Sequence, residues 1–151
     1  MKELIDKLYK TGELEAGEFK ELLENRSPQL SEYLFAKARE VQAENYGRDV
    51  YIRGLIEFTN YCKNDCYYCG IRKSNAKAER YRLSKEEILG CCEAGYELGF
   101  RTFVLQGGED GYYTEERMTD IIRSIKRNHP DCALTLSFGE KSYATYRAFF
   151  E

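Results

Sequence analysis

The sequence TNYCKNDCYYCGI, residues 59–71, contains three closely spaced cysteines, Cys62, Cys66 and Cys69, in the pattern C-x3-C-x2-C. Thiolates are soft donors, and short spacings of this kind bring several of them onto one inorganic centre. Three ligands are one fewer than the usual set for an iron–sulfur cluster, so one coordination position stays open. Open positions are typical of catalytic metal sites, whereas structural sites are closed. The spacing therefore predicts a [4Fe–4S] cluster whose fourth iron binds a small molecule.

A zinc site, or three unrelated buried thiols, is the alternative interpretation of this triplet. Zinc sites usually add a second C-x2-C pair or a histidine pair, whereas His129 is the only histidine of the chain. The remaining cysteines, Cys91, Cys92 and Cys132, fall in an expected helix and at the start of an expected strand. Free cysteine packs as a small hydrophobic residue, so we expect all three in the core.

The composition is that of a globular protein. Charged residues make up 32% of the chain and hydrophobic ones 42%, which is ordinary for a soluble domain, and 151 residues can bury a core. The formal net charge of −3 does not favour a nucleic-acid-binding protein. No apolar run approaches the ~20 residues of a membrane span. We therefore expect no binding to nucleic acid and no membrane insertion.

The cysteine content indicates a reducing compartment. Residues 1–18 are too acidic and too interrupted for a signal peptide. The chain has six cysteines, and the three clustered ones fit a metal site better than a disulfide framework. We expect a cytoplasmic location.

Two segments with different patterns divide the chain. Residues 1–47 are expected to form a helical segment, because apolar residues recur at helical spacing. Ser27 and Pro28 are typical of a helix start, and Gly47 of a helix end. Residues 48–151 alternate between strand-like and helix-like patterns. Strands are expected at residues 51–59, 101–106 and 132–138, and helices at 84–98, from 114 and from about 141.

This alternation predicts an α/β fold of βαβ units with a parallel sheet. In the last two expected strands, polar Gln106, Thr135 and Ser137 alternate with apolar residues such as Leu105 and Leu136. We expect the apolar face to pack under helices and the polar face to line a barrel lumen. The three polar residues are therefore candidates for cofactor binding, with structural hydrogen bonding as the alternative role.

The length accommodates only part of a barrel. A complete (β/α)8 barrel needs ~250 residues, whereas about three βα units can be recognised in residues 48–151. These residues are therefore too few for a complete barrel of that kind. A three-stranded parallel sheet leaves an edge unpaired and one face uncovered. Poor solubility of the isolated chain is the expected consequence.

A resemblance to the radical S-adenosylmethionine (SAM) superfamily is carried by four runs of the sequence, residues 54–75, 80–89, 101–113 and 134–142. The signature of that superfamily is C-x3-C-x-aromatic-C, and Tyr68 stands at the aromatic position. Within the superfamily, residues 46–151 resemble the HydE family of [FeFe]-hydrogenase maturases. The resemblance implies a TIM-like (β/α)8 barrel. Because members of that family continue well past the equivalent of residue 151, we expect this chain to be the N-terminal part of such a barrel, truncated at its C-terminus and preceded by the helical segment 1–47.

The resemblance also implies which residues contact the cofactors. The three clustered cysteines would hold the [4Fe–4S] cluster, and the main chain at Tyr68 would meet the adenine of SAM. Gly107, Gly108 and Glu109 match a Gly-Gly-Glu element that contacts the amino group of SAM. Glycine permits close approach of the main chain, and a carboxylate or carbonyl oxygen accepts hydrogen bonds from an ammonium group.

The basic connection from residue 70 to residue 82 allows two interpretations. Its arginines and lysines are solvated, or Arg72 or Arg82 neutralises an anionic ligand, since guanidinium suits bidentate carboxylate contacts. Glu140 also matches a HydE-like run, but the sequence assigns it no role.

The function implied by the resemblance is reductive cleavage of SAM to methionine and a 5′-deoxyadenosyl radical, in the maturation of the [FeFe]-hydrogenase H-cluster. A small-molecule or organometallic iron substrate, an electron donor such as ferredoxin or flavodoxin, and other hydrogenase maturation proteins are the implied partners. No acid–base residue is required for the cleavage. Two alternatives remain: another radical SAM enzyme, of the biotin synthase or methylornithine synthase type, or a non-catalytic iron–sulfur electron-transfer or scaffold module.

Overall fold

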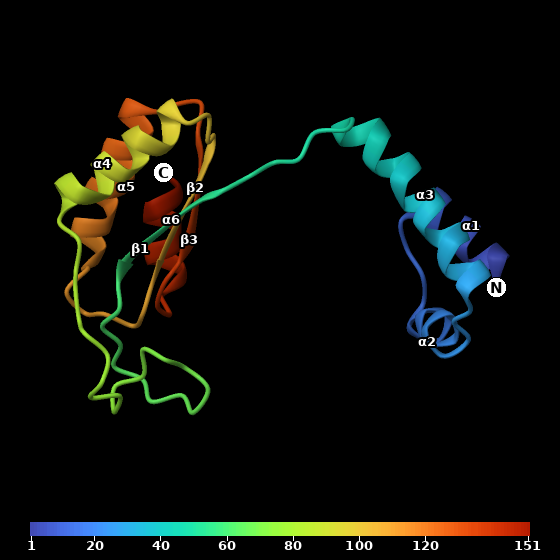
Figure 1. Cartoon of the computed structure of the whole chain (residues 1–151), viewed down its shortest axis with the longest axis horizontal. Helices are drawn as coiled ribbons and strands as arrows, with labels where there is room; N and C mark the ends of the chain where they lie inside the picture. The colour runs from blue at the N-terminus through green and yellow to red at the C-terminus, as the bar shows by residue number, and fades with distance from the viewer. The chain divides into compact units, whose positions relative to one another are not determined.

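A computed structural model describes all residues from 1 to 151, which form two compact units, Met1–Tyr51 and Ile52–Glu151 (Figure 1). The first unit contains α1 (Lys2–Thr11), α2 (Ala16–Glu24) and α3 (Pro28–Tyr46). The second contains β1 (Gly54–Thr59), α4 (Lys85–Glu97), β2 (Thr102–Gly107), α5 (Glu115–Asn128), β3 (Ala133–Ser137) and α6 (Tyr143–Phe150).

The first unit consists of three helices, and the sequence predicts both ends of the third, α3, correctly. The Ser27 side chain accepts a hydrogen bond from the main-chain N–H of Leu30, and Pro28 is the first residue of α3. Gly47 ends that helix with a φ of 62°, which favours glycine. Ile5 is the one residue of these helices that is fully buried. No helix anywhere in the chain combines the length and the hydrophobicity needed to cross a bilayer.

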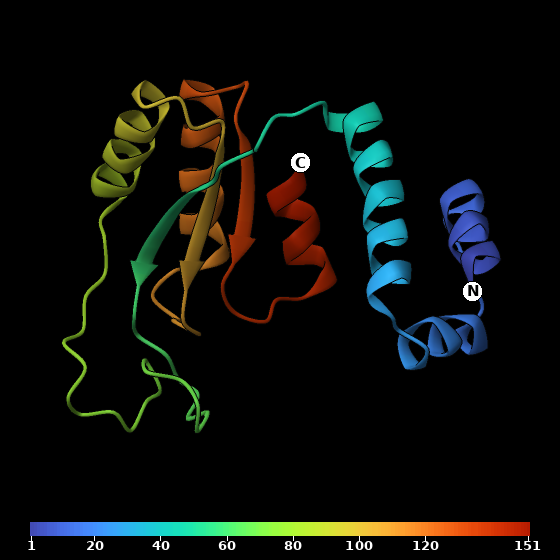
Figure 2. The same ribbon diagram turned by 45° about the vertical axis from the view of Figure 1, so that its right-hand side comes forward.

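The second unit is a parallel three-stranded sheet in the order β1-β2-β3, with α4, α5 and α6 following the strands in turn (Figure 2). This confirms the expected α/β fold. The first strand begins three residues later than predicted, because Tyr51, Ile52 and Arg53 are exposed and have no partner in the sheet. Ser84 and Glu87, whose spacing in the sequence is that of a capping box, form one at the start of α4.

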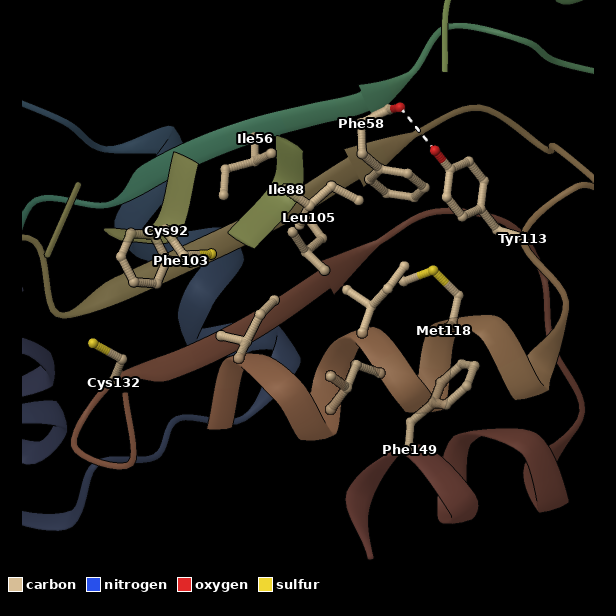
Figure 3. Close-up of a cluster of buried hydrophobic side chains, with 13 residues drawn as sticks. Ile56, Phe58, Ile88, Cys92, Phe103, Leu105, Tyr113, Met118, Cys132 and Phe149 are labelled. Atoms are coloured by element: carbon tan, nitrogen blue, oxygen red, sulfur yellow. Dashed lines mark hydrogen bonds between the residues drawn. The ribbon is translucent and has the colours of Figure 1, made fainter. Parts of the chain in front are cut away.

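One face of the sheet carries the core (Figure 3). Phe58, Phe103 and Leu105 of the strands belong to one buried cluster with Cys92 of α4 and Met118 of α5. Burial of each such side chain contributes roughly 1.5–3 kcal/mol. The alternation predicted for the strands is confirmed, since every second strand residue packs under the helices.

The three cysteines that were expected in the core differ in their burial. Cys92 and Cys132 are buried, and burial raises the pKa of the Cys92 thiol to about 12. Cys91 is exposed, so its expected place in the core is wrong. Neighbouring residues on a helix point about 100° apart, and only Cys92 faces the sheet.

This difference gives a matched pair of variants for the core. Cys92→Ser places a hydroxyl in a fully buried apolar position and is expected to lower the free energy of unfolding by about 1–3 kcal/mol. Cys91→Ser alters an exposed position and is expected to change it by less than about 0.5 kcal/mol. Urea unfolding of both variants measures the difference, and equal losses would contradict the burial described here.

Candidate functional site

The candidate site lies at the carboxyl ends of β1 and β2 (Figure 2). β1 runs into the cysteine loop, which we define as residues 60–82. β2 ends in the Gly-Gly-Glu turn, residues 107–109. The carboxyl ends of parallel strands open onto one edge of the sheet, where α/β proteins commonly place binding sites. The topology therefore brings Cys62 of the cysteine loop next to Glu109 of the turn, 47 positions further along the sequence.

The Gly-Gly-Glu turn packs directly on the start of the cysteine loop. A Cβ atom on Gly108 would lie 2.8 Å from the Cβ of Cys62 and closer still to the main-chain oxygen of Tyr61. A Cβ on Gly107 would lie 2.7 Å from the Cγ2 of Thr59. Neither position has room for a side chain. The glycines thus permit a close approach of the turn to the cysteine loop.

Main-chain hydrogen bonds join the two segments. The N–H of Lys63 donates to the carbonyl of Glu109 over 3.0 Å. The N–H of Glu109 donates to the Sγ of Cys62 over 3.4 Å. One residue of the turn therefore contacts both the first cysteine of the triplet and the residue after it.

The three cysteines of the triplet are free thiols in one loop. Cys62 and Cys69 are half-buried and Cys66 is exposed, and the N–H of Cys69 donates to the carbonyl of Cys66 over 3.0 Å. Their donor chemistry suits an iron–sulfur cluster. The structure does not, however, gather any three His, Cys, Asp or Glu side chains closely enough to hold a metal ion. Their assignment as cluster ligands rests on residue type and spacing.

Arg80 organises the cysteine loop from within. Its guanidinium donates hydrogen bonds to four main-chain carbonyl groups, those of Asn60, Ile71, Arg72 and Asn75. These acceptors lie at the start and in the middle of the loop, so this one side chain holds together main-chain segments that no helix or strand organises. The basic connection from residue 70 to residue 82 is therefore more than a set of solvated charges. The sequence pattern did not reveal this role of Arg80.

Arg82 is committed to an internal ion pair and not to an open anion site. Its Nε and Nη2 atoms lie 2.7 and 2.9 Å from the two carboxylate oxygens of Asp110. Thr59 donates its hydroxyl to the same carboxylate over 2.7 Å. Burial alone would raise the pKa of Asp110, but the hydrogen bonds from Arg82, from the main chain of Tyr112 and from Thr59 outweigh it and lower that pKa.

The Glu109 side chain links the cysteine loop to the end of β3. One carboxylate oxygen accepts the main-chain N–H of Glu140 over 2.7 Å, and the other lies 3.8 Å from the ammonium group of Lys63. Glu140, to which the sequence assigned no role, thus takes part through its main chain.

The open face of the sheet carries the predicted polar residues. Gln106 and Ser137 are exposed and are paired neighbours in the sheet, and Thr135 is exposed one pleat earlier. Glu57 of β1 pairs with Gln106 and extends this polar row across all three strands. The sequence analysis missed Glu57, although its alternation with buried Ile56 and Phe58 was a usable signal.

Tyr68 has little contact with the rest of the chain. Its side chain is 92% exposed and that of neighbouring Tyr67 is fully exposed. Any role of Tyr68 in binding therefore belongs to its main chain or to contacts with a ligand.

Comparison with known proteins identifies the same regions. Residues 56–141 match the model of the Radical SAM superfamily, a span that includes the cysteine loop, the Gly-Gly-Glu turn and all of β3. The chain is 38% identical over 139 residues to the [FeFe] hydrogenase maturase subunit HydE of Thermotoga maritima, covering 92% of this chain and 39% of that protein. It is 34% identical over 142 residues to the 3-methylornithine synthase of Methanosarcina acetivorans, covering 93% of this chain and 40% of that protein.

Solved structures show the same relationship. HydG, a maturase of the [FeFe]-hydrogenase, aligns with a TM-score of 0.83 at 26% identity, over 98% of this chain and 34% of HydG. Methylornithine synthase (PylB) aligns with a TM-score of 0.75 at 30% identity, over 97% of this chain and 44% of PylB. The α/β unit is thus part of a radical SAM barrel, as expected. From its matching model, its relatives and its fold, the chain belongs to the radical SAM superfamily of enzymes, whose members use a [4Fe–4S] cluster and S-adenosylmethionine.

Proposed function

We propose that residues 52–151 form the cluster- and SAM-binding part of a radical SAM enzyme that acts in maturation of the [FeFe]-hydrogenase H-cluster. The observation that carries this proposal is the packing of the Gly-Gly-Glu turn on the cysteine loop. Glu109, whose N–H donates to the Sγ of Cys62, also places its carboxylate and its main-chain carbonyl at this edge of the sheet. Such an edge can hold a cluster and an amino-acid ligand side by side.

In this proposal Cys62, Cys66 and Cys69 each donate a thiolate to one [4Fe–4S] cluster and leave one iron without a protein ligand. The loop supplies all three thiols, and their convergence accompanies cluster binding. When both are bound, the reduced cluster supplies the electron that cleaves SAM to methionine and a 5′-deoxyadenosyl radical.

The protein's own residues bind and orient SAM. Gly107, Gly108 and Glu109 accept the amino group, and the main chain at Tyr68 meets the adenine. The open sheet face supports this placement, because Gln106, Thr135 and Ser137 lie next to the turn and are exposed. Their amide and hydroxyl groups can both donate and accept hydrogen bonds with the ribose.

Hydrogenase maturation is proposed because of the similarity to HydE, which extends over 92% of this chain. The chain spans only 39% of the length of that relative. A small-molecule or organometallic iron substrate, a ferredoxin or flavodoxin as electron donor, and other maturation proteins are the proposed partners. Six free thiols suit the reducing cytoplasm.

A 3-methylornithine synthase is the second candidate, favoured by 34% identity over 93% of this chain and by the structural match to PylB. Both candidates share the cysteine loop and the Gly-Gly-Glu turn. They differ in the substrate that receives the radical.

Anaerobic reconstitution with iron and sulfide tests the proposed radical chemistry. SAM is expected to change the EPR spectrum of the reduced cluster, because its head groups bind the open iron. Dithionite with SAM is expected to yield 5′-deoxyadenosine. A cluster that gives neither result would instead indicate an electron-transfer or scaffold module. Formation of 3-methylornithine from an added amino-acid substrate would favour the second candidate.

Loss of one proposed ligand is expected to abolish cluster binding. Cys66→Ser removes an exposed thiolate without disturbing the core, so iron and sulfide contents after reconstitution should fall to background. Cys91→Ser is the matched control, because it removes another exposed cysteine that is outside the triplet. Equal iron contents in the two variants would argue against the ligand assignment.

Loss of the arginine that organises the cysteine loop is expected to weaken cluster assembly while sparing the fold. Arg80→Gln keeps some hydrogen-bonding capacity but cannot reach four carbonyl groups. Iron incorporation should slow, and hydrogen exchange across residues 60–82 should rise by about tenfold or more, since each charged hydrogen bond contributes ~1.5–3 kcal/mol. Arg123→Gln, at an exposed position on α5, serves as the control. Unchanged exchange in the Arg80 variant would contradict this role.

A further inference from the structure

We propose that the ion pair of Arg82 and Asp110 is a positioning clamp that holds the N–H of Glu109 on the sulfur of Cys62. We call the group formed by Thr59, Arg82 and Asp110 the clamp. Its effect on a bound cluster rests on the function proposed above, whereas its effect on the geometry of the turn does not.

The clamp joins three segments at the edge of the sheet. Thr59 is the last residue of β1, Arg82 is the last residue of the cysteine loop, and Asp110 directly follows the Gly-Gly-Glu turn. The Asp110 side chain is only 3% exposed. A bidentate guanidinium–carboxylate contact fixes both distance and orientation. Both ends of the cysteine loop are thereby tied to the residue beside Glu109.

Aromatic contacts hold the guanidinium of Arg82 in place. Its central carbon lies 3.9 Å from the ring centre of Tyr61 and 4.9 Å from that of Tyr112. Tyr61 precedes Cys62 directly, so the same arginine contacts both the carboxylate next to the turn and the ring next to the first cysteine. The main-chain N–H of Tyr112 donates to Asp110 over 3.0 Å and orients the carboxylate from the other side.

The consequence of this arrangement is the placement of one main-chain N–H. Glu109 lies between Gly108, which touches Cys62, and Asp110, which the clamp fixes. Its N–H has a sulfur acceptor, the Sγ of Cys62, at 3.4 Å. The hydrogen bonds of Arg82 and Asp110 do not involve the Glu109 N–H itself. The clamp therefore acts by fixing the position of the peptide group that carries this N–H. Arg82 and Asp110 are positioning residues and need not touch a ligand.

A hydrogen bond to a ligand sulfur has a known direction of effect. It withdraws electron density from the thiolate and favours the reduced cluster, so it raises the reduction potential. The same turn is proposed to accept the amino group of SAM. The clamp would therefore make the Gly-Gly-Glu turn couple the position of bound SAM to the reduction potential of the cluster.

Two single variants and their double test the clamp. Arg82→Gln removes the cation and shortens the side chain, and Asp110→Asn removes the anion with little change in volume. In the metal-free chain, hydrogen exchange in peptides covering residues 107–113 is expected to rise by about tenfold to a hundredfold in either variant, since charged hydrogen bonds are lost. The double variant is expected to exchange no faster than the single variants, because the two residues act as a pair. Asp131→Asn is the matched control: Asp131 pairs with Arg101, which also stacks on a tyrosine, at the opposite end of the sheet.

The midpoint reduction potential distinguishes an effect of the clamp on the Glu109 N–H from a direct effect of the charges of Arg82 and Asp110. If the clamp acts through the Glu109 N–H, both variants shift the midpoint potential of the reconstituted cluster in the negative direction. If only local charge matters, loss of the cation lowers the potential and loss of the anion raises it, and the proposal for the cluster is overturned. Unchanged exchange in residues 107–113 overturns the clamp itself. A wild-type chain that binds no cluster refutes the proposed function, and the exchange experiment still decides whether the clamp exists.

Discussion

The contact between the Gly-Gly-Glu turn and the cysteine loop is the constraint on which the rest of the site depends. Gly107 and Gly108 have no room for a Cβ atom, since Thr59, Tyr61 and Cys62 occupy that space. The contact is possible because β1 and β2 are parallel neighbours, so the segments that follow them leave the sheet at the same edge. The core on the opposite face holds the two strands in this register. Packing within the protein itself therefore holds the turn against the cysteine loop.

A long loop of irregular structure needs its own hydrogen-bond partners, and here two arginines provide many of them. Arg80 binds four carbonyl groups within the loop, and Arg82 ties its end to Asp110. Main-chain groups that no helix or strand satisfies must find other partners or water. Guanidinium groups suit this task because they present five donors in a fixed plane. The loop is thus shaped by side chains from its own second half.

The open face of the sheet is polar and takes no part in the core. Glu57, Gln106 and Ser137 form one polar row across the strands, and the apolar residues point to the helices. Polar residues on this face contribute little to the core. They are therefore available to contact a ligand, as proposed above for Gln106 and Ser137 with SAM.

The sequence by itself determined the family, the α/β fold, the caps of α3 and α4, and the polar alternation of Gln106, Thr135 and Ser137. These features are local, because a motif spacing, a hydrophobic period or a helix cap depends on residues that are close together in the chain. Only the tertiary structure decided that Cys91 is exposed, that Arg82 pairs with Asp110 and that the Glu109 N–H meets Cys62. Each of these depends on the rotation of a helix or on strand ends brought together from distant positions, which no local pattern encodes.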